Sequence, residues 1–277
     1  MGSNLDDRTV ASFGDEWSRF DQQAMSSREA QRRFLEYFEI FPWHDLPSDA
    51  EGFDMGCGSG RWARFVSARV GRLHCIEPSV RALTVAKQVL ADKNNLVFHQ
   101  GSVAASGLPT SSQDFGYSLG VLHHVPDTAA AIQSCAALLK PNAPLLLYLY
   151  YAFDNRPVWF RVIWRVSNIG RLFICCLPVR FKQFVTDLIA IVIYWPLARL
   201  AALLESFGLP VDVIPLSYYR HNSFYTMRTD ARDRFGTPLE HRFTRKKIIA
   251  MCQAAGLTDL RFSSHAPYWC VVGLKGN

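Results

Sequence analysis

Three alternating glycines behind an aspartate are the first residues in this sequence whose spacing could do chemistry. Within the run 51–61, Asp54 stands two residues before Gly56, and Gly58 and Gly60 follow at alternate positions. Glycine is needed where the backbone takes a positive φ or comes close to a ligand. A dinucleotide-binding fingerprint would require another glycine at position 61, where this chain has arginine. Because a carboxylate accepts hydrogen bonds from an ammonium group but repels a pyrophosphate, the loop suits a ligand that carries an amino-acid group.

A second acid, Glu77, follows these glycines by about twenty residues. The run 72–77 predicts a strand that ends in this carboxylate, and Pro78 begins the next helix. At such a position a carboxylate can accept hydrogen bonds from both hydroxyls of a ribose. A strand, a glycine turn and a helix N-terminus together form a nucleotide-binding corner in doubly wound α/β folds.

Two adjacent histidines, His123 and His124, follow a predicted strand at 114–119. Imidazole titrates near neutral pH, so each side chain is a candidate general base. Adjacent residues in a turn point in different directions, and at most one of the two is expected to face a substrate. A hydrogen bond to nearby backbone is the alternative role for either.

The run from Asp54 to Gly60 resembles the first motif of the class I S-adenosylmethionine-dependent methyltransferases. The run from Gly120 to Val125 is similar to the motif that follows their fourth strand. The resemblance covers residues 10–150 and the C-terminal tail. It implies S-adenosyl-L-methionine as cofactor and an α/β fold: a doubly wound, seven-stranded, mostly parallel Rossmann-like sheet. A C-terminal antiparallel hairpin and a helical insertion after the fifth strand complete the expected architecture.

The resemblance also implies a set of cofactor-binding residues. Ser102 stands where the family commonly has an aspartate that binds the adenine amino group, and its hydroxyl can still accept one weaker hydrogen bond. Main-chain groups at the end of the fourth strand are expected to meet the methionine end of the cofactor. The expected set is Phe13, Trp17, Asp54, Gly56, Cys57, Gly58, Gly60, Glu77, Pro78, Ser102, Val103, Leu119 and Gly120.

Residues 1–45 predict a helical lid. Ser12 followed by Asp15 approximates a capping box, and Phe13, Trp17 and Phe20 fall near one helical face. Such a stripe can face the core, or it can cover the cofactor, because aromatic faces attract a sulfonium as they attract other cations. The segment resembles the F-G-x-E-W leader that precedes some bacterial methyltransferase cores, which favours the lid.

The core is expected to comprise residues 46–151 and 209–277. Further strands are predicted at 96–100 and 145–151, and a helix at 128–139 lies between them. The turn at 140–144 lacks the glycines usual in the family, so its type must differ. Residues 233–240 predict a loop, Thr244 an N-cap for a helix at 245–255, and residues 258–264 and 268–274 the closing hairpin.

Residues 152–208 form the predicted insertion, with helices at 159–173 and 183–205 and a kink at Pro196. Three interpretations are open for it. It can cap the active site, it can form a homodimer interface, or residues 158–205 can make a peripheral membrane contact. The third would place arginines at lipid headgroups and three tryptophans in the interface: Trp159, Trp164 and Trp195.

Candidate acceptor residues come from two places. Tyr148, Tyr150 and Tyr151 lie at the end of the predicted fifth strand. In this family the segment after that strand is expected to reach over the pocket. It adds five candidates: Tyr218, Tyr219, Arg220, His221 and Arg234. The catalytic candidates are Tyr219 and His221 from this segment, together with His123 and His124. An ordinary salt-bridged surface would explain these arginines equally well.

Composition limits the partners. At 277 residues and 49% hydrophobic the chain can hold one large domain, or a core with an insertion. The net charge of +6 and the pI of 9.0 favour acidic partners. Nucleic acid is not an expected partner, because no nucleic-acid-binding module is present and the N-P-P-Y-type motif of base methylation is absent after the fourth strand. No metal is expected, since the carboxylates near the pocket form no ligand cluster.

Cysteine usage and the absence of a signal peptide at the N-terminus predict a cytoplasmic location. The seven cysteines form no C-x-x-C pair, which suits a reducing compartment. The longest uncharged apolar run, 188–198, is shorter than a bilayer span.

The expected activity is methyl transfer from S-adenosyl-L-methionine to oxygen, nitrogen or carbon of a small or lipid-like metabolite. Alignment of acceptor and methyl group supplies most of the acceleration, and a base matters only where the acceptor must lose a proton. Two alternatives keep the cofactor. The same fold can catalyse a cyclisation or rearrangement, or the chain can be a non-catalytic partner subunit.

Overall fold

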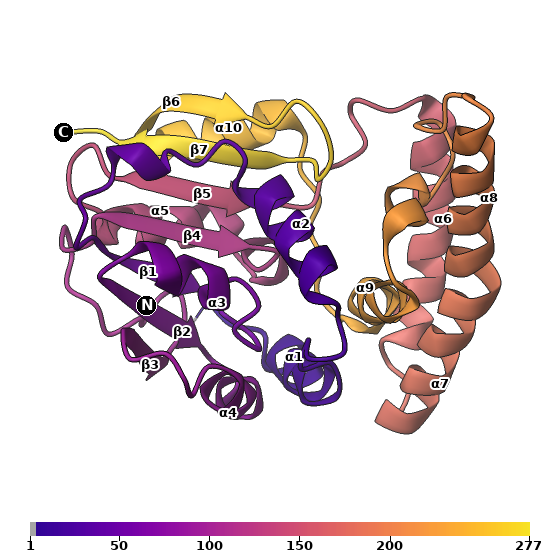
Figure 1. The fold of residues 1–277 in the computed structure, drawn as a ribbon, viewed down its shortest axis with the longest axis horizontal. Coiled ribbons are helices and arrows are strands. Elements are labelled where there is room, and N and C mark those ends of the chain that lie inside the picture. Colours follow the sequence, from indigo (N-terminus) through magenta and orange to yellow (C-terminus); the bar gives the residue numbers. More distant parts are fainter. Residues whose placement is uncertain (1–3) are drawn as a thin grey trace. The chain divides into compact units, whose positions relative to one another are not determined.

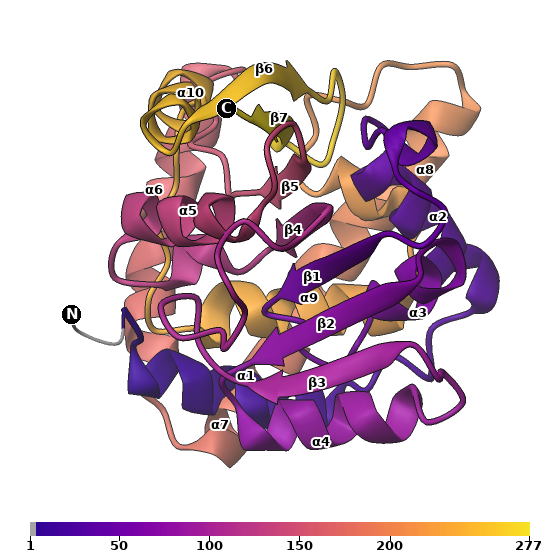
Figure 2. The same cartoon turned by 90° about the vertical axis from the view of Figure 1, so that its left-hand side faces the viewer.

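The computed structural model describes residues 4–277 and contains one seven-stranded sheet in the order β3-β2-β1-β4-β5-β7-β6 (Figures 1 and 2). Five strands run parallel and β7 runs antiparallel to β5 and β6. The strand bounds are β1 Glu51–Met55, β2 Arg72–Glu77, β3 Leu96–Gln100, β4 Phe115–Leu119, β5 Pro144–Tyr148, β6 Leu257–Phe262 and β7 Cys270–Lys275. The expected methyltransferase sheet and its closing hairpin are therefore confirmed.

The order of the strands reverses between β1 and β4, which are neighbours although two strands separate them in the chain. Ligands of open α/β sheets bind beyond the carboxyl ends of the strands at such a switch point. The central strands β4 and β5 are covered on both faces, which explains why Leu145, Leu146 and Leu147 form an uninterrupted apolar run.

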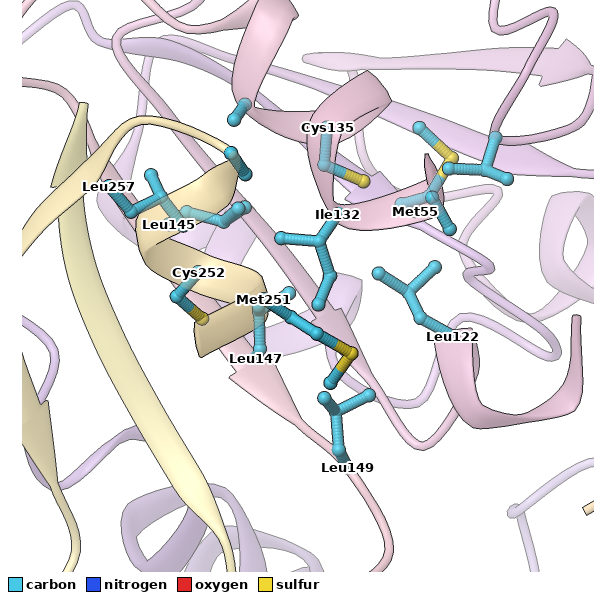
Figure 3. Packing of buried hydrophobic residues seen from close by; sticks show 14 of the residues in the cluster. Met55, Leu122, Ile132, Cys135, Leu145, Leu147, Leu149, Met251, Cys252 and Leu257 are labelled. Carbon is cyan, nitrogen blue, oxygen red and sulfur yellow. The ribbon is translucent and has the colours of Figure 1, made fainter. Parts of the chain in front are cut away.

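Two apolar layers cover the sheet. On one face α5 (Thr128–Leu138) and α10 (Arg245–Ala254) pack against side chains from β1 and β5 (Figure 3). On the other face lie α3 (Ala63–Val66), α4 (Val80–Val89) and the aromatic side chains of residues 31–38. Burial of these two clusters positions the strand ends that carry the polar residues described below.

The N-terminal helix α1 (Asp7–Arg19) begins earlier than predicted. Asp6 is its N-cap and accepts a hydrogen bond from Thr9 N at 2.8 Å, whereas Ser12 lies buried inside the helix. The predicted capping box at Ser12 is therefore wrong. Helix α2 (Ser27–Phe38) follows after a short turn.

Two other local predictions have clear outcomes. Thr244 caps α10 through a hydrogen bond from Lys247 N, as predicted. The turn at 140–144 contains no glycine, and Asn142 supplies its positive φ of 64°. Asparagine tolerates this conformation better than most residues.

Contacts divide the chain into two compact units. The first holds the sheet and comprises the residues up to Gln22, Gln31–Ala152 and Leu239–Asn277. The second comprises Gln23–Ala30 and Phe153–Pro238. It therefore extends beyond residue 208, where the sequence analysis ended the insertion.

The second unit is helical. Its elements are α6 (Val158–Ile174), α7 (Val179–Ile189), a π-helical turn (Ala190–Tyr194), α8 (Trp195–Ser206), a 3-10 turn (Ser217–His221) and α9 (Phe224–Gly236). Helix α9 occupies the first half of the predicted loop at 233–240, so the predicted start of that loop is wrong.

Within the described part of the chain, one continuous helix, Val179–Ser206, is long and apolar enough by length and composition to cross a membrane. The uncharged run inside it, residues 188–198, is by itself shorter than a bilayer span. The helix continues past Asp187 and Arg199 on either side of that run, and 22% of its most apolar window is buried.

Candidate cofactor site

The glycine loop leaves the end of β1 and is tied to β2. The backbone amides of Gly56 and Cys57 donate to Ile76 O at 2.8 and 3.1 Å. Gly56 and Gly58 have φ values of 81° and 55°, which side chains rarely adopt. A Cβ on Gly58 would lie 2.9 Å from the Trp17 indole nitrogen, so the residue must be glycine for α1 to approach the loop.

The carboxylate of Glu77 lies directly against this loop. Gly58 N donates to its Oε2 at 3.0 Å, and Ser79 N donates to its Oε1 at 2.9 Å. Burial raises the pKa of Glu77 to about 7, although the two amide hydrogen bonds act to lower it. Each carboxylate oxygen keeps a further lone pair, so the group can accept hydrogen bonds from a pair of ligand hydroxyls.

Asp54 lies at the base of the loop and is 1% exposed. Tyr117 OH donates to its Oδ2 at 3.0 Å. Burial raises the pKa of Asp54 to about 8. The hydrogen bond from Tyr117 acts to lower this pKa, and the nearby charge of Glu77 acts to raise it. None of the groups that shift the pKa of Asp54 or Glu77 is positively charged. A cationic ligand group would therefore stabilise the ionised form of either carboxylate.

Helix α1 brings two aromatic side chains to this end of the sheet. Trp17 lies over Gly58, and the Arg61 guanidinium lies 5.7 Å from the Trp17 ring centroid. Phe13 meets His124 edge-on, with 5.0 Å between ring centroids. The predicted lid residues thus lie beside both the glycine loop and the histidine pair.

The remaining predicted cofactor residues follow the edges of the same site. Pro78 precedes Ser79, the N-cap of α4. Ser102 is buried in a tight turn in which Ala105 N donates to Ser102 O at 3.0 Å, and Val103 joins the apolar layer under α5.

Space is open at the end of β4. Leu119 is buried, and Gly120 has a φ of 80° and an amide that donates to Tyr148 O at 3.1 Å. A Cβ on Gly120 would have a single atom of the described chain within 4 Å, Tyr148 Cδ1 at 3.9 Å. A ligand can therefore approach the backbone closely at this position.

His123 is fully buried beyond β4 and stacks on Tyr150, with 3.8 Å between ring centroids. Its Nδ1 accepts a hydrogen bond from Tyr150 N at 3.4 Å, whereas its Nε2 has no hydrogen-bond partner in the described chain. Burial holds the pKa of His123 well below its usual range, and the positive charges of His124, Arg242 and His241 add to this. The imidazole is therefore neutral at physiological pH.

His124 has a different hydrogen-bond partner. Its Nδ1 lies 2.6 Å from Leu239 O, which makes Nδ1 the protonated nitrogen when the ring is neutral. The two imidazole rings nevertheless lie together, with 4.1 Å between their centroids, so the prediction that the two side chains point in different directions is wrong and only their hydrogen-bond partners differ.

A third histidine, His241, was missed by sequence reasoning. Its backbone amide donates to His123 O at 2.8 Å, and its Nε2 has no hydrogen-bond partner in residues 4–277. Burial lowers the pKa of His241. The adjacent Arg242 lies over the Tyr150 ring at 5.0 Å and donates to Glu240 Oε1 at 2.8 Å. No local motif surrounds these residues, so no sequence signal could have found them.

The other candidates make contacts within their own units. Tyr151 lies against Tyr268, with 5.6 Å between ring centroids. Tyr218 and Tyr219 belong to the second unit, as do three charged candidates with partners inside that unit. Arg220 and His221 pair with Glu205 at 2.9 and 2.8 Å, and Arg234 donates to Ser167 Oγ at 3.3 Å.

The polar groups of the first unit fit a nucleoside that carries an amino-acid group. Two buried polar atoms beside the loop and the β4 end, Ser59 Oγ and His123 Nε2, have no hydrogen-bond partner in the described chain. Two buried carboxylates, Asp54 and Glu77, flank the same loop. Buried polar groups of this kind are costly unless a ligand satisfies them. Residues 4–277 contain no group of three or more His, Cys, Asp or Glu side chains that could hold a metal ion.

Comparison with known proteins agrees with this geometry. Residues 53–147 match a family model described as a methyltransferase domain. Over 112 residues the chain is 35% identical to the ubiquinone biosynthesis O-methyltransferase of Nitrosomonas europaea, an alignment that covers 39% of this chain and 46% of that protein. The chain thus spans about half the length of that relative. The protein of the same name from Stutzerimonas stutzeri is 24% identical over 244 residues, or 82% of this chain and 94% of the relative.

Solved structures are similar in fold. The crystal structure of a Bacillus halodurans protein with the methyltransferase fold covers 83% of this chain and 70% of its own, with a TM-score of 0.52 and 12% sequence identity. At that identity the likeness shows the fold alone.

Proposed function

We propose that this chain is a class I S-adenosylmethionine-dependent methyltransferase that acts on a small or lipid-like metabolite, which the match of residues 53–147 to a methyltransferase-domain model supports. The observation that supports the proposal best is the Glu77 carboxylate held against the Gly58 amide at 3.0 Å. This contact places an acceptor for ribose hydroxyls beside a loop that admits close backbone approach.

The cofactor is S-adenosyl-L-methionine, which when bound supplies an electrophilic methyl group on a sulfonium. We assign its ribose to Glu77 and its ammonium group to Asp54, beside the glycine loop. Ser102 and Val103 would border the adenine, and the backbone at Leu119 and Gly120 would border the methionine end. Phe13 and Trp17 would cover the site from α1.

Oxygen is the acceptor atom that we favour. Both relatives are named O-methyltransferases of ubiquinone biosynthesis. A hydroxyl acceptor must lose its proton as it reacts, and a neutral imidazole with an unused nitrogen can take it. His123 is buried and neutral, and its Nε2 has no hydrogen-bond partner in residues 4–277. Nε2 would take the proton in the tautomer that carries the ring hydrogen on Nδ1, which gives up the long 3.4 Å hydrogen bond from Tyr150 N. Tyr148 and Tyr150, which flank His123, would border the acceptor.

Two further assignments complete the proposal. None of the seven cysteines forms a disulfide, which supports a reducing, cytoplasmic location. Residues 158–205 would make a peripheral membrane contact, and the competing arrangement is a homodimer through the same residues.

Turnover by the purified full chain tests the function. The protein is incubated with S-adenosylmethionine carrying a deuterated methyl group and with the lipid and small-molecule fractions of a bacterial extract. We expect S-adenosylhomocysteine to accumulate together with an organic product that carries the deuterated methyl group. Cofactor binding without a labelled product in any fraction would contradict the proposal.

A further inference from the structure

The second unit exposes an unusual number of large apolar side chains. Of the 26 exposed large hydrophobic residues in the described chain, 20 lie between Val158 and Phe207. Scattered exposed residues are normal, but a contiguous exposed patch marks a site of interaction with another surface. We define the outer face by six of these residues, which come from α6, α7 and the π-helical turn: Val166, Ile169, Phe173, Phe181, Phe184 and Ile191.

Two basic side chains of this unit, one on α6 and one on α7, are turned inward toward the end of α9. Figures 1 and 2 show α6, α7 and α8 in one layer with α9 on one side of it. Arg171 is 5% exposed and donates to Thr237 O and Pro238 O at 2.9 and 2.7 Å. Lys182 Nζ donates to Gly236 O at 3.4 Å. These contacts satisfy carbonyl groups at the C-terminal end of α9 and remove two basic groups from the exposed surface of the helices.

The acids of the same helices also face inward. Asp187 pairs with Arg228 of α9 at 2.9 Å, and Glu205 pairs with Arg220 and His221. Phe173, Phe181 and Phe184, in contrast, are 72%, 65% and 67% exposed. A unit that pairs these two acids within itself and exposes its phenylalanines has the polarity of a lipid-facing element.

The charge around the outer face favours anionic lipid over a second copy of the chain as its binding partner. Residues 156–204 contain seven Lys or Arg residues and one acid, Asp187, which is paired. Arg161, Arg165 and Arg180 are exposed on α6 and α7, the two helices that supply most of the outer face. A second copy of the chain would bring these arginines to a surface with no exposed acid between 156 and 204, whereas anionic lipid headgroups would complement them.

Tryptophans reinforce this choice. Trp159 and Trp195 are 42% and 49% exposed, at the start of α6 and of α8. Tryptophan is enriched at the level of lipid headgroups, where one side of the ring is apolar and the other meets water.

The topology requires the helices to lie in the membrane interface rather than to span it. The insertion leaves the sheet after β5 and returns before α10, so both of its ends lie on the same side of a membrane. A crossing by Val179–Ser206 would need a second crossing for the return. Helix α6 cannot supply one, because it has 17 residues and three arginines: Arg161, Arg165 and Arg171.

We propose that the outer face inserts in-plane into one leaflet of a membrane that carries anionic lipids. The inference deepens the proposed function and rests on it in one respect: an enzyme held at a lipid surface meets an acceptor that is dissolved in that surface. The membrane contact itself does not depend on turnover, and it can be tested separately.

The test is flotation of the full chain with phosphatidylcholine vesicles, with and without phosphatidylglycerol. We expect the protein to float with the anionic vesicles and to bind neutral vesicles more weakly. Phe184→Asp should lower the bound fraction about tenfold or more, because it places a charge among the apolar residues. Leu35→Asp is the matched control, since Leu35 is an exposed leucine of the first unit, and it should float like the wild type.

Two further measurements keep the test decisive. Arg161→Glu with Arg165→Glu should abolish the preference for anionic vesicles. Each variant should retain S-adenosylmethionine binding, which shows that the first unit is folded and separates failure of the membrane proposal from failure of the proposed function. A wild type that remains soluble with anionic vesicles would overturn the inference. So would a lipid-free homodimer that Phe184→Asp converts to monomers while vesicle binding is unchanged.

Discussion

The backbone amide of Gly58 donates a hydrogen bond to the carboxylate of Glu77 across 3.0 Å. This contact joins the turn after β1 to the end of β2, and the Ser79 amide holds the other carboxylate oxygen at 2.9 Å. Glu77 is therefore fixed in position before any ligand arrives. A preorganised acceptor lowers the entropic cost of binding, because fewer groups must be ordered.

Gly58→Ala should weaken S-adenosylmethionine binding at least about tenfold, because the new Cβ would meet the Trp17 indole at 2.9 Å. The positive φ adds a backbone cost of about 1–2 kcal/mol in the free energy of unfolding. Gly107→Ala is the matched control, since Gly107 has a φ of 78° and no atom of the described chain within 4 Å of the new Cβ. Urea unfolding should show similar destabilisation of the two variants. Calorimetry should show a loss of cofactor affinity in Gly58→Ala alone.

Trp17→Ala should also weaken binding, by about tenfold, because it removes the aromatic face that α1 places over the loop. Most of the change should appear as faster cofactor dissociation in stopped-flow fluorescence. Trp159→Ala, in the second unit, removes an exposed tryptophan and should leave the affinity unchanged. Equal dissociation rates in wild type and Trp17→Ala would contradict the lid.

The stability of the cofactor-free protein should fall as pH rises from about 4 to about 8. The pKa values of Asp54 and Glu77 are raised to about 8 and about 7 in the folded protein, so the folded state binds more protons than the unfolded state over this range. Each group can contribute a slope of up to about 1.4 kcal/mol per pH unit. Urea unfolding of Asp54→Asn should give a shallower dependence, and an unchanged slope would rule out a raised pKa at Asp54.

His123→Gln should lower kcat by about 10²–10⁴ with little change in cofactor affinity, if the acceptor is a hydroxyl. Because burial lowers the pKa of His123, the acidic limb of the wild-type kcat profile should lie below pH about 6.5. His44→Gln changes an exposed histidine and should leave the profile unchanged. An acidic limb that persists unaltered in His123→Gln would assign the proton transfer to another group.

Local signals allowed prediction of the parts of the site that lie within a few residues of one another. The β1 strand, the glycine loop and the β2 acid follow from residues 51–77, and Thr244 with Gly256 bounded α10 correctly. Each of these elements carries its own start or stop residue, so no distant contact is needed to specify it.

Distant contacts decided the rest. Both Asp6 and Ser12 can cap a helix, and sequence alone does not show that Ser12 is buried within α1. Helix α9 continues to Gly236 because Lys182 binds its last carbonyl from another helix. Neither contact leaves a local pattern in the sequence.

His241 illustrates the same limit within the site. It reaches His123 because the segment after α9 pairs with the end of β5, where Phe243 N donates to Tyr150 O at 2.8 Å. The pairing brings together residues that are far apart in the chain, and no motif announces it. The sequence likewise predicts the outer face only in part. Its apolar residues alternate with arginines, and the helical period alone does not show whether each arginine points inward or outward.

Calorimetric titration of the full chain with S-adenosylmethionine tests the central assignment most directly. The wild type should bind, and Glu77→Ala should bind about a hundredfold more weakly, because two charge-assisted hydrogen bonds to the ribose are lost. Glu39→Ala removes an exposed carboxylate and should bind like the wild type. A folded wild type with no affinity, or a Glu77→Ala variant that binds as tightly as the wild type, would contradict the account.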